Sequence, residues 1–107
     1  MKIKLLATAL AASLIVATQA QAHHSFSAEF DAEKKITKRG IVTKIDWTNP
    51  HTYIFMEVPG AKGVENWAFE MGSPNGLMRR GWTKDTLGIG TEVIIQGSQA
   101  RDGSLKG

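Results

Sequence analysis

Apolar and polar residues alternate along much of the chain, and this alternation predicts β-strands. The first predicted strand covers residues 36–47, and one side of it would carry Ile41, Thr43, Ile45 and Trp47. Gly40 interrupts the pattern, which predicts a bulge or a sharp bend inside this strand. Residues 52–58 are rich in β-branched and aromatic side chains and predict a second strand.

Two further strands are predicted, over residues 65–71 and 91–96, with residues 99–101 extending the last one. Asn49-Pro50 is a strong turn signal, and the loop at residues 59–63 predicts a hairpin between the second and third strands.

The segment between the third and fourth strands predicts a short helix. Ser73 suits the N-cap and Pro74 suits the first helical position, so we expect a helix over residues 75–80 that ends at Gly81. Residues 83–87 predict a second helical turn.

Asp102-Gly103 is a hairpin signal near the end of the sequence. Only residues 104–107 follow it, so we expect the sequence to stop before a last strand. The order of elements predicts a mainly β fold, a small and partly open OB-like β-barrel with one short helix that lacks its last strand.

Residues 1–22 have the pattern of a cleavable secretory signal peptide. Lys2 and Lys4 precede an apolar run, and small residues stand at positions −3 and −1 of a cut after Ala22. The run is shorter than the roughly 20 apolar residues that span a membrane, so we expect no stable membrane insertion after signal removal. We expect a periplasmic protein whose mature chain begins at His23, with a cut after Ala20 as the alternative.

Loss of this segment changes the charge balance. The sequence holds 13 basic and 10 acidic residues, and without Lys2 and Lys4 the basic count falls to 11. Such a balance does not predict a nucleic-acid surface. The mature chain is then one small domain, with an N-terminal arm over residues 23–35 and the barrel over residues 36–107. The absence of cysteine excludes thiolate metal sites, so the domain depends on its core, a metal or a partner.

All three histidines, His23, His24 and His51, are candidate metal ligands. A free N-terminal His23 can bind copper through its α-amine and its ring, and a remote imidazole then completes a histidine brace. Nitrogen ligands in tetragonal geometry suit Cu(II). His51, after the Asn49-Pro50 turn, is the first candidate for the remote ligand, and His24 is the second.

Two variations of this site stay open. If the signal is cut after Ala20, His23 is the third residue of the mature chain. It would then chelate Cu(II) or Ni(II) together with the amine and two backbone amides. Zinc is an alternative metal, with Glu29 or Asp31 as an added ligand.

The leading functional hypothesis is therefore a copper carrier or buffer. The alternative is a metal-free module that holds a periplasmic protein or a small ligand on the barrel face through Trp47, Tyr53 and Trp67, although these tryptophans also suit the core. A copper oxidase or oxygenase is a third hypothesis. The sequence shows no catalytic triad spacing, phosphate loop or dinucleotide fingerprint, so it predicts no catalytic residue and leaves enzymatic activity open.

Five short motifs are spread over the predicted mature chain: HHSF at 23–26, AEFD at 28–31, WTNPH at 47–51, EMGSP at 70–74 and LxRRGW at 77–82. Together they resemble a family of small exported bacterial proteins of unknown function. The resemblance covers essentially the whole mature chain and implies a single periplasmic β-rich domain. It also implies a further strand after Asp102-Gly103, and it implies no activity.

Overall fold

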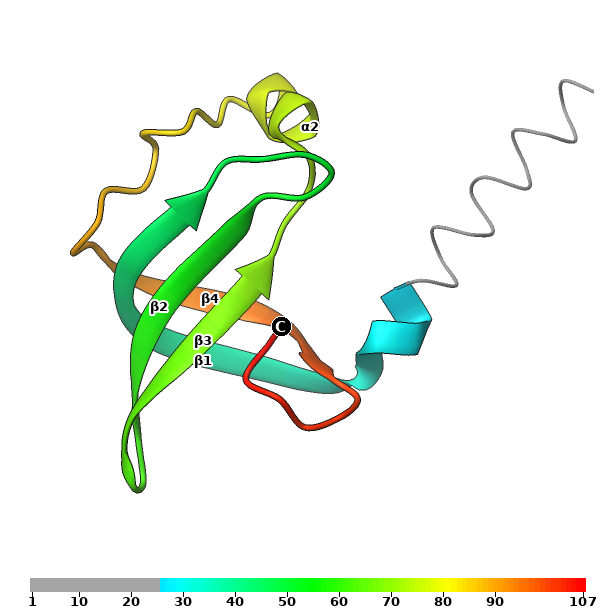
Figure 1. The fold of residues 1–107 in the computed structure, drawn as a ribbon, viewed down its shortest axis with the longest axis vertical. Helices are drawn as coiled ribbons and strands as arrows, with labels where there is room; N and C mark the ends of the chain where they lie inside the picture. Colours follow the sequence, from blue (N-terminus) through cyan, green and yellow to red (C-terminus); the bar gives the residue numbers. More distant parts are fainter. Residues whose placement is uncertain (1–25) are drawn as a thin grey trace, which may run out of the picture.

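The sheet is organised by its long first strand, β1 (Phe30–Asp46), which pairs with two neighbours along different parts of its length. The computed structural model describes residues 26–107. Residues 30–41 of β1 pair antiparallel with β4 (Glu92–Ala100), and residues 41–46 pair antiparallel with β2 (Tyr53–Gly60). With β3 (Gly63–Glu70) the strand order is β3-β2-β1-β4, and Figure 1 shows how β1 curves between its two partners.

Gly40 lies where β1 passes from one partner to the other, and only glycine fits there. A Cβ atom at this position would lie 2.2 Å from the backbone oxygen of Glu57. The close approach of the two backbones, followed by a register shift between Val42 and Lys44, agrees with the predicted irregularity.

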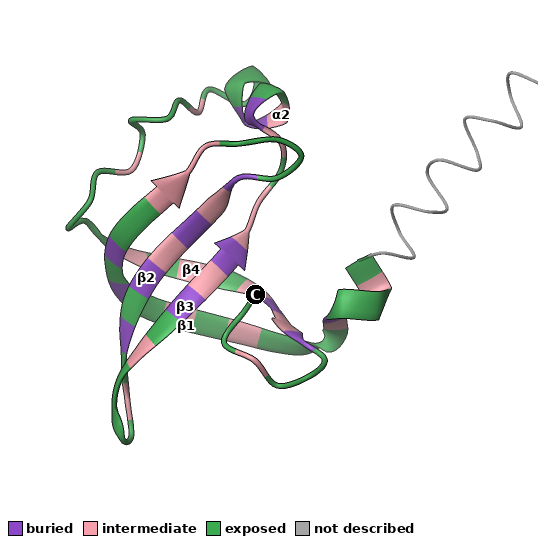
Figure 2. Ribbon diagram, in the orientation of Figure 1, coloured by how far each residue is buried: buried purple, intermediate pink, exposed green. Residues whose placement is uncertain are grey.

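The core lies on one face of this curved sheet. In β2 every second residue, Ile54, Met56 and Val58, is buried, as are Trp67 and Phe69 in β3. They pack with Val42 into one cluster, and Figure 2 shows the buried positions alternating with intermediate or exposed ones along these strands. The period of two in the sequence is therefore the period of burial.

The local signals of turns and caps are also found in the structure. The β2–β3 hairpin closes at Gly60 and Gly63, and Gly63 has a φ of +122°, a conformation that favours glycine. Helix α2 (Pro74–Arg79) has Ser73 as its N-cap, whose hydroxyl accepts a hydrogen bond from Gly76 N. Gly81, with a φ of +92°, follows the helix as predicted.

Three expectations need correction. β1 begins at Phe30, within the segment that we expected to be an N-terminal arm, because residues 30–35 pair with the end of β4. Residues 83–87 form a hydrogen-bonded turn and no helix. The mainly β fold with one short helix is confirmed, but its four strands form an open sheet that does not close into a barrel.

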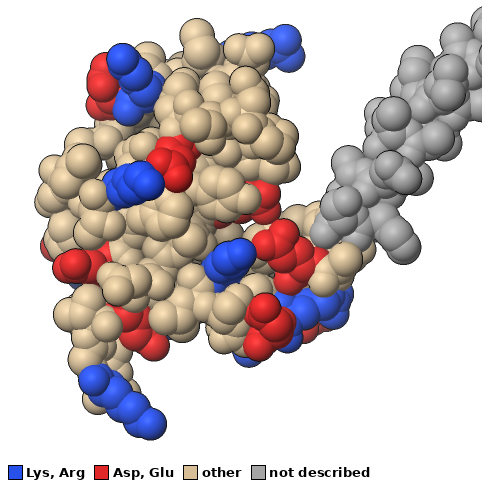
Figure 3. All heavy atoms as spheres, viewed as in Figure 1, with Lys and Arg blue, Asp and Glu red and all other residues tan. Residues whose placement is uncertain are grey.

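Among residues 26–107, no helix has the length and apolar character needed to cross a membrane. On the face shown in Figure 3, basic and acidic side chains lie among one another, and no large area carries a single sign of charge.

Candidate metal site

His51 lies two residues before β2, where the backbone holds it against the end of β3. Thr52 N donates to Gly72 O over 3.0 Å, and Met71 N donates to Thr52 O over 2.8 Å. These bonds place the His51 ring beside the backbone of Met71, where Nδ1 lies 3.1 Å from the Met71 carbonyl oxygen. A carbonyl oxygen only accepts hydrogen bonds, so Nδ1 carries the hydrogen and the neutral ring keeps its lone pair on Nε2.

A carboxylate faces that lone pair. Glu70 Oε1 lies 3.6 Å from His51 Nε2, with the Glu70 side chain 19% exposed and the His51 side chain 48% exposed. The same oxygen accepts a hydrogen bond from the Tyr53 hydroxyl at 3.2 Å. His51 and Glu70 thus offer one nitrogen and one oxygen ligand side by side, open to solvent.

The surroundings of Tyr53 change the pKa of its phenol. Burial raises the pKa of its phenol above the ordinary 10.0, and the negative charge of Glu70 and the hydrogen bond to Glu70 raise it further. The phenol therefore stays neutral at physiological pH and serves as a donor that holds the carboxylate.

The N-terminal end of the described chain reaches the same place. Phe26, Phe30, His51 and Glu70 line one surface depression of about 390 Å³. The rings of Phe26 and Phe30 pack with their centroids 5.5 Å apart, and the helical turn at residues 26–29 is joined to Arg101, whose backbone N donates to Glu29 O over 2.8 Å. Phe26, the first described residue, therefore lines the same depression as His51.

His23 and His24 lie outside the described residues, three and two positions before Phe26. Within residues 26–107, no three His, Asp or Glu side chains lie close enough together to hold a metal ion.

The three aromatic candidates do not share one surface. Trp67 is 3% exposed and stacks on Phe69 in the core, with the Lys38 ammonium 4.6 Å from its ring. Tyr53 is on the opposite face of the sheet, since it pairs with Glu70 whereas Trp67 pairs with the inward Met56. Trp47 is half-buried and lines a small internal cavity of about 10 Å³.

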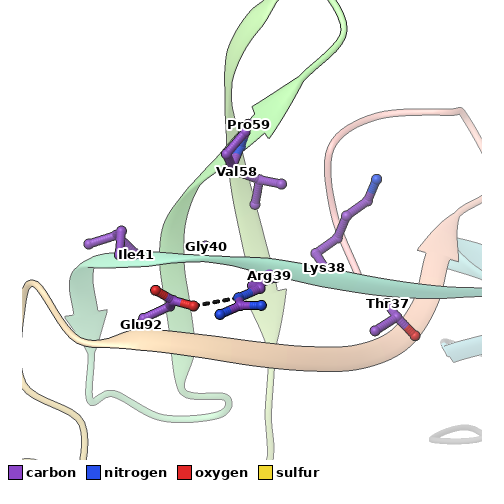
Figure 4. Close-up of a pocket in the computed structure, with 8 residues that line it drawn as sticks. All are labelled: Thr37, Lys38, Arg39, Gly40, Ile41, Val58, Pro59 and Glu92. Atoms are coloured by element: carbon purple, nitrogen blue, oxygen red, sulfur yellow. Dashed lines mark hydrogen bonds and ion pairs between the residues drawn. The ribbon is translucent and has the colours of Figure 1, made fainter.

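A further hollow lies elsewhere and carries none of the predicted site residues. Its volume is about 570 Å³, and it lies over the bend at Gly40. Figure 4 shows its one ion pair, between Arg39 of β1 and Glu92 of β4. Both side chains are more than half exposed, so the pair contributes little to stability or to recognition.

Glu70 and the Met71 carbonyl are parts of the site that the sequence did not predict. The missing information was the register of the β2–β3 hairpin, which pairs Gly60 with Gly63 and therefore Tyr53 with Glu70. A two-residue turn at Ala61 and Lys62 predicts the same register, but the broad loop expected at residues 59–63 left it undetermined.

The model of one known protein family matches the chain. The model of a family of unknown function, DUF6152, matches residues 11–107. The chain belongs to this family. Membership in DUF6152 agrees with the resemblance to a family of unknown function, and it brings no activity with it. No curated protein and no solved structure matches the chain.

Proposed function

We propose that this protein is an exported copper-binding protein, a carrier or buffer, that holds Cu(II) between its mature N-terminus and His51. The observation that carries the proposal is the hydrogen bond from His51 Nδ1 to the Met71 carbonyl. Metal-binding histidines commonly donate their second ring nitrogen in this way, which fixes the ring and leaves Nε2 for the metal.

The ligand set follows from the chemistry of these groups. The α-amine and ring of His23 would supply two nitrogen atoms, and His51 Nε2 would supply a third. Three nitrogen ligands in one plane suit Cu(II) better than the oxygen-preferring divalent ions. Glu70, 3.6 Å from Nε2, would add negative charge beside the cation and so favour its binding. His24 is the alternative N-terminal imidazole.

The location is part of the same proposal. The signal-peptide pattern of residues 1–22 supports export to the periplasm, and cleavage after Ala22 would create the free amine that the site needs. Cleavage after Ala20 would move the amine two residues away and replace the brace by a chelate at His23. The N-terminal sequence of the mature protein thus determines which copper chemistry is available.

The test begins with the intact mass of protein purified from the periplasm, followed by Cu(II) titration and electron paramagnetic resonance. The proposal expects a chain that begins at His23 and binds one Cu(II) with a spectrum typical of nitrogen ligands. His51→Ala should weaken binding at least ten-fold and remove one nitrogen from the spectrum. Acetylation of the amine, or His23→Ala, should weaken binding further.

A matched pair of carboxylate variants controls for charge. Glu57 is exposed on β2, on the same strand as Tyr53 but away from His51. Glu70→Gln should weaken Cu(II) binding several-fold, whereas Glu57→Gln should leave it unchanged. Equal affinity in the unaltered protein and in His51→Ala would overturn the proposal.

The metal-free binding module has weaker support. It relied on Trp47, Tyr53 and Trp67 acting together, and the burial of Trp67 removes that residue from any surface that a ligand could reach. A ligand at this face would therefore depend on Tyr53 and the neighbouring Phe55, whose rings lie 6.3 Å apart.

A further inference from the structure

The carboxylate of Glu70 is held in place beside the imidazole of His51. Its Oε1 atom lies 3.6 Å from His51 Nε2 and accepts the hydrogen of the Tyr53 hydroxyl at 3.2 Å. Glu70 and Tyr53 are also direct cross-strand partners, so the backbone ladder of β2 and β3 fixes where both side chains begin. The Glu70 side chain is only 19% exposed, so water and salt screen its charge incompletely. A negative charge therefore lies at a defined place next to the Nε2 lone pair.

The other residue in contact with the His51 ring presents an oxygen atom as well. Met71 meets His51 with its carbonyl oxygen, 3.1 Å from Nδ1, whereas its side chain packs against the hydrophobic core cluster. The chain has no cysteine. Soft sulfur ligands, thiolate and thioether, are the donors that select Cu(I). The contacts of His51 are thus a carboxylate and a carbonyl, and their charge and dipole favour the more highly charged ion, Cu(II).

We propose that Glu70, positioned by Tyr53, makes the copper site selective for the oxidation state of the metal, so that the protein holds Cu(II) and releases it on reduction to Cu(I). This inference rests on the proposed function and adds what determines when copper leaves. A small one-electron reductant of the ascorbate class supplies the electron. Cu(II) gains one electron, ascorbate loses one and becomes its radical, and Glu70 keeps its charge throughout.

The selectivity follows from the charge of the ion. The Coulomb energy between two charges is proportional to each of them, so a carboxylate at a fixed distance attracts Cu(II) with twice the energy with which it attracts Cu(I). Affinity depends exponentially on energy, so the factor that Glu70 contributes to Cu(II) binding is the square of its factor for Cu(I). A roughly three-fold effect on Cu(I) then corresponds to a roughly nine-fold effect on Cu(II). Because the ratio of the two affinities sets the reduction potential, Glu70 lowers the potential of bound copper.

Tyr53 acts through Glu70 and is therefore a positioning residue. Its hydroxyl donates to the same carboxylate oxygen that faces His51 Nε2. Without this donor the flexible Glu70 side chain is free to turn its carboxylate towards solvent. The charge would remain, but its mean distance from the metal would increase. Loss of the Tyr53 hydroxyl should thus act in the same direction as loss of the Glu70 charge, with a smaller effect.

The first test compares the two oxidation states in the unaltered protein and in Glu70→Gln. Competition with chelators specific for each ion gives the Cu(II) and Cu(I) affinities, and spectroelectrochemistry gives the midpoint potential. Glu70→Gln should weaken Cu(II) binding roughly nine-fold and Cu(I) binding roughly three-fold. This three-fold change in the ratio raises the midpoint potential by about 28 mV, at about 59 mV for each ten-fold change. Glu57→Gln, at an exposed carboxylate of β2, is the matched control and should change none of the three quantities.

Variants of Tyr53 and Met71 test the two remaining steps. Tyr53→Phe should raise the potential less than Glu70→Gln does, and in the Glu70→Gln background it should add no further shift, since it acts through that carboxylate. A purely structural role of Tyr53 would instead weaken both ions equally and leave the potential unchanged. Met71→Leu keeps the carbonyl and removes the sulfur, so both affinities should stay the same. A selective loss of Cu(I) binding in Met71→Leu would reveal a thioether ligand and overturn the proposal.

Release is measured on the Cu(II)-loaded protein with bathocuproine disulfonate, a chelator that captures Cu(I). Copper should pass to the chelator only after ascorbate is added. Copper that stays bound after reduction, or a potential that is the same in Glu70→Gln and in the unaltered protein, would overturn this inference. The proposed function would stand in that case, provided that His51→Ala still weakens Cu(II) binding. Equal Cu(II) affinity in the unaltered protein and in His51→Ala would overturn both.

Discussion

Tyr53 donates its phenol hydrogen to Glu70 Oε1 over 3.2 Å, and the two residues are direct cross-strand partners in the β2–β3 ladder. The pair connects the fold to the candidate metal site, since the same carboxylate oxygen lies 3.6 Å from His51 Nε2. A hydrogen-bonded carboxylate is restricted in its rotation, which gives the histidine a fixed negative neighbour.

The titration of Tyr53 provides a direct measure of this contact. Burial and the neighbouring Glu70 raise its pKa above 10.0, and it is the one tyrosine of the chain, so phenolate absorbance reports on it alone. The folded protein thus binds the phenol proton more tightly than the unfolded chain does. The resulting stabilisation is complete below pH 10.0 and is lost as the pH rises through the raised pKa of the folded state.

Glu70→Gln should lower the pKa of Tyr53 towards 10.0 without removing the whole shift, because burial, its largest cause, remains. Glu57→Gln is the matched control and should leave the titration unchanged. A midpoint in the unaltered protein at or below 10.0 would contradict the contact.

Gly40→Ala should destabilise the protein strongly. The new Cβ atom would meet the backbone oxygen of Glu57 at 2.2 Å, and two paired strands cannot separate without losing ladder bonds. Overpacking typically costs about 1–3 kcal/mol, and we expect a loss at or above the upper end of that range in urea denaturation. Gly72→Ala, where a Cβ atom meets nothing within 4 Å, should cost under about 1 kcal/mol. Similar losses for the two variants would argue against the close approach at Gly40.

Met56→Ala tests the core. The Met56 side chain is 1% exposed and belongs to the cluster between β1, β2 and β3, so truncation should cost about 2–5 kcal/mol. For a domain of this size such a loss is a large part of the total stability. Val64→Ala, at a side chain that is 65% exposed, should change the free energy of unfolding by less than about 1 kcal/mol. Chemical denaturation of both variants provides the comparison.

Ser73→Ala tests the start of α2. The Ser73 hydroxyl accepts the hydrogen bond from Gly76 N, and loss of such a cap costs about 1 kcal/mol. Ser73→Asp should restore most of the stability, since its carboxylate accepts the same bond and suits the positive end of the helix. An unchanged midpoint of denaturation in Ser73→Ala would show that α2 is held by packing of Leu77 and Pro74 instead.

Short-range rules account for the parts of this protein that sequence analysis predicted well. Alternation of apolar residues located β2 and β3, and Ser73, Pro74 and Gly81 located the helix. In each case the residues that stabilise the element lie within it or next to it in the sequence. The predicted start of β1, at residue 36, was wrong for the opposite reason. Residues 31–35 are mostly charged, which does not predict a strand. They belong to β1 because this part of the chain pairs with the end of β4, far along the sequence.

The candidate site depends on contacts that no local pattern contains. The sequence singled out His51 as a ligand, because histidine is rare and chemically distinctive. Its neighbours Glu70 and Met71 follow from hairpin register, and the position of Phe26 at the same depression follows from tertiary packing. Register and curvature are set by backbone pairing between distant segments, and side-chain periodicity records only which face of each strand is buried.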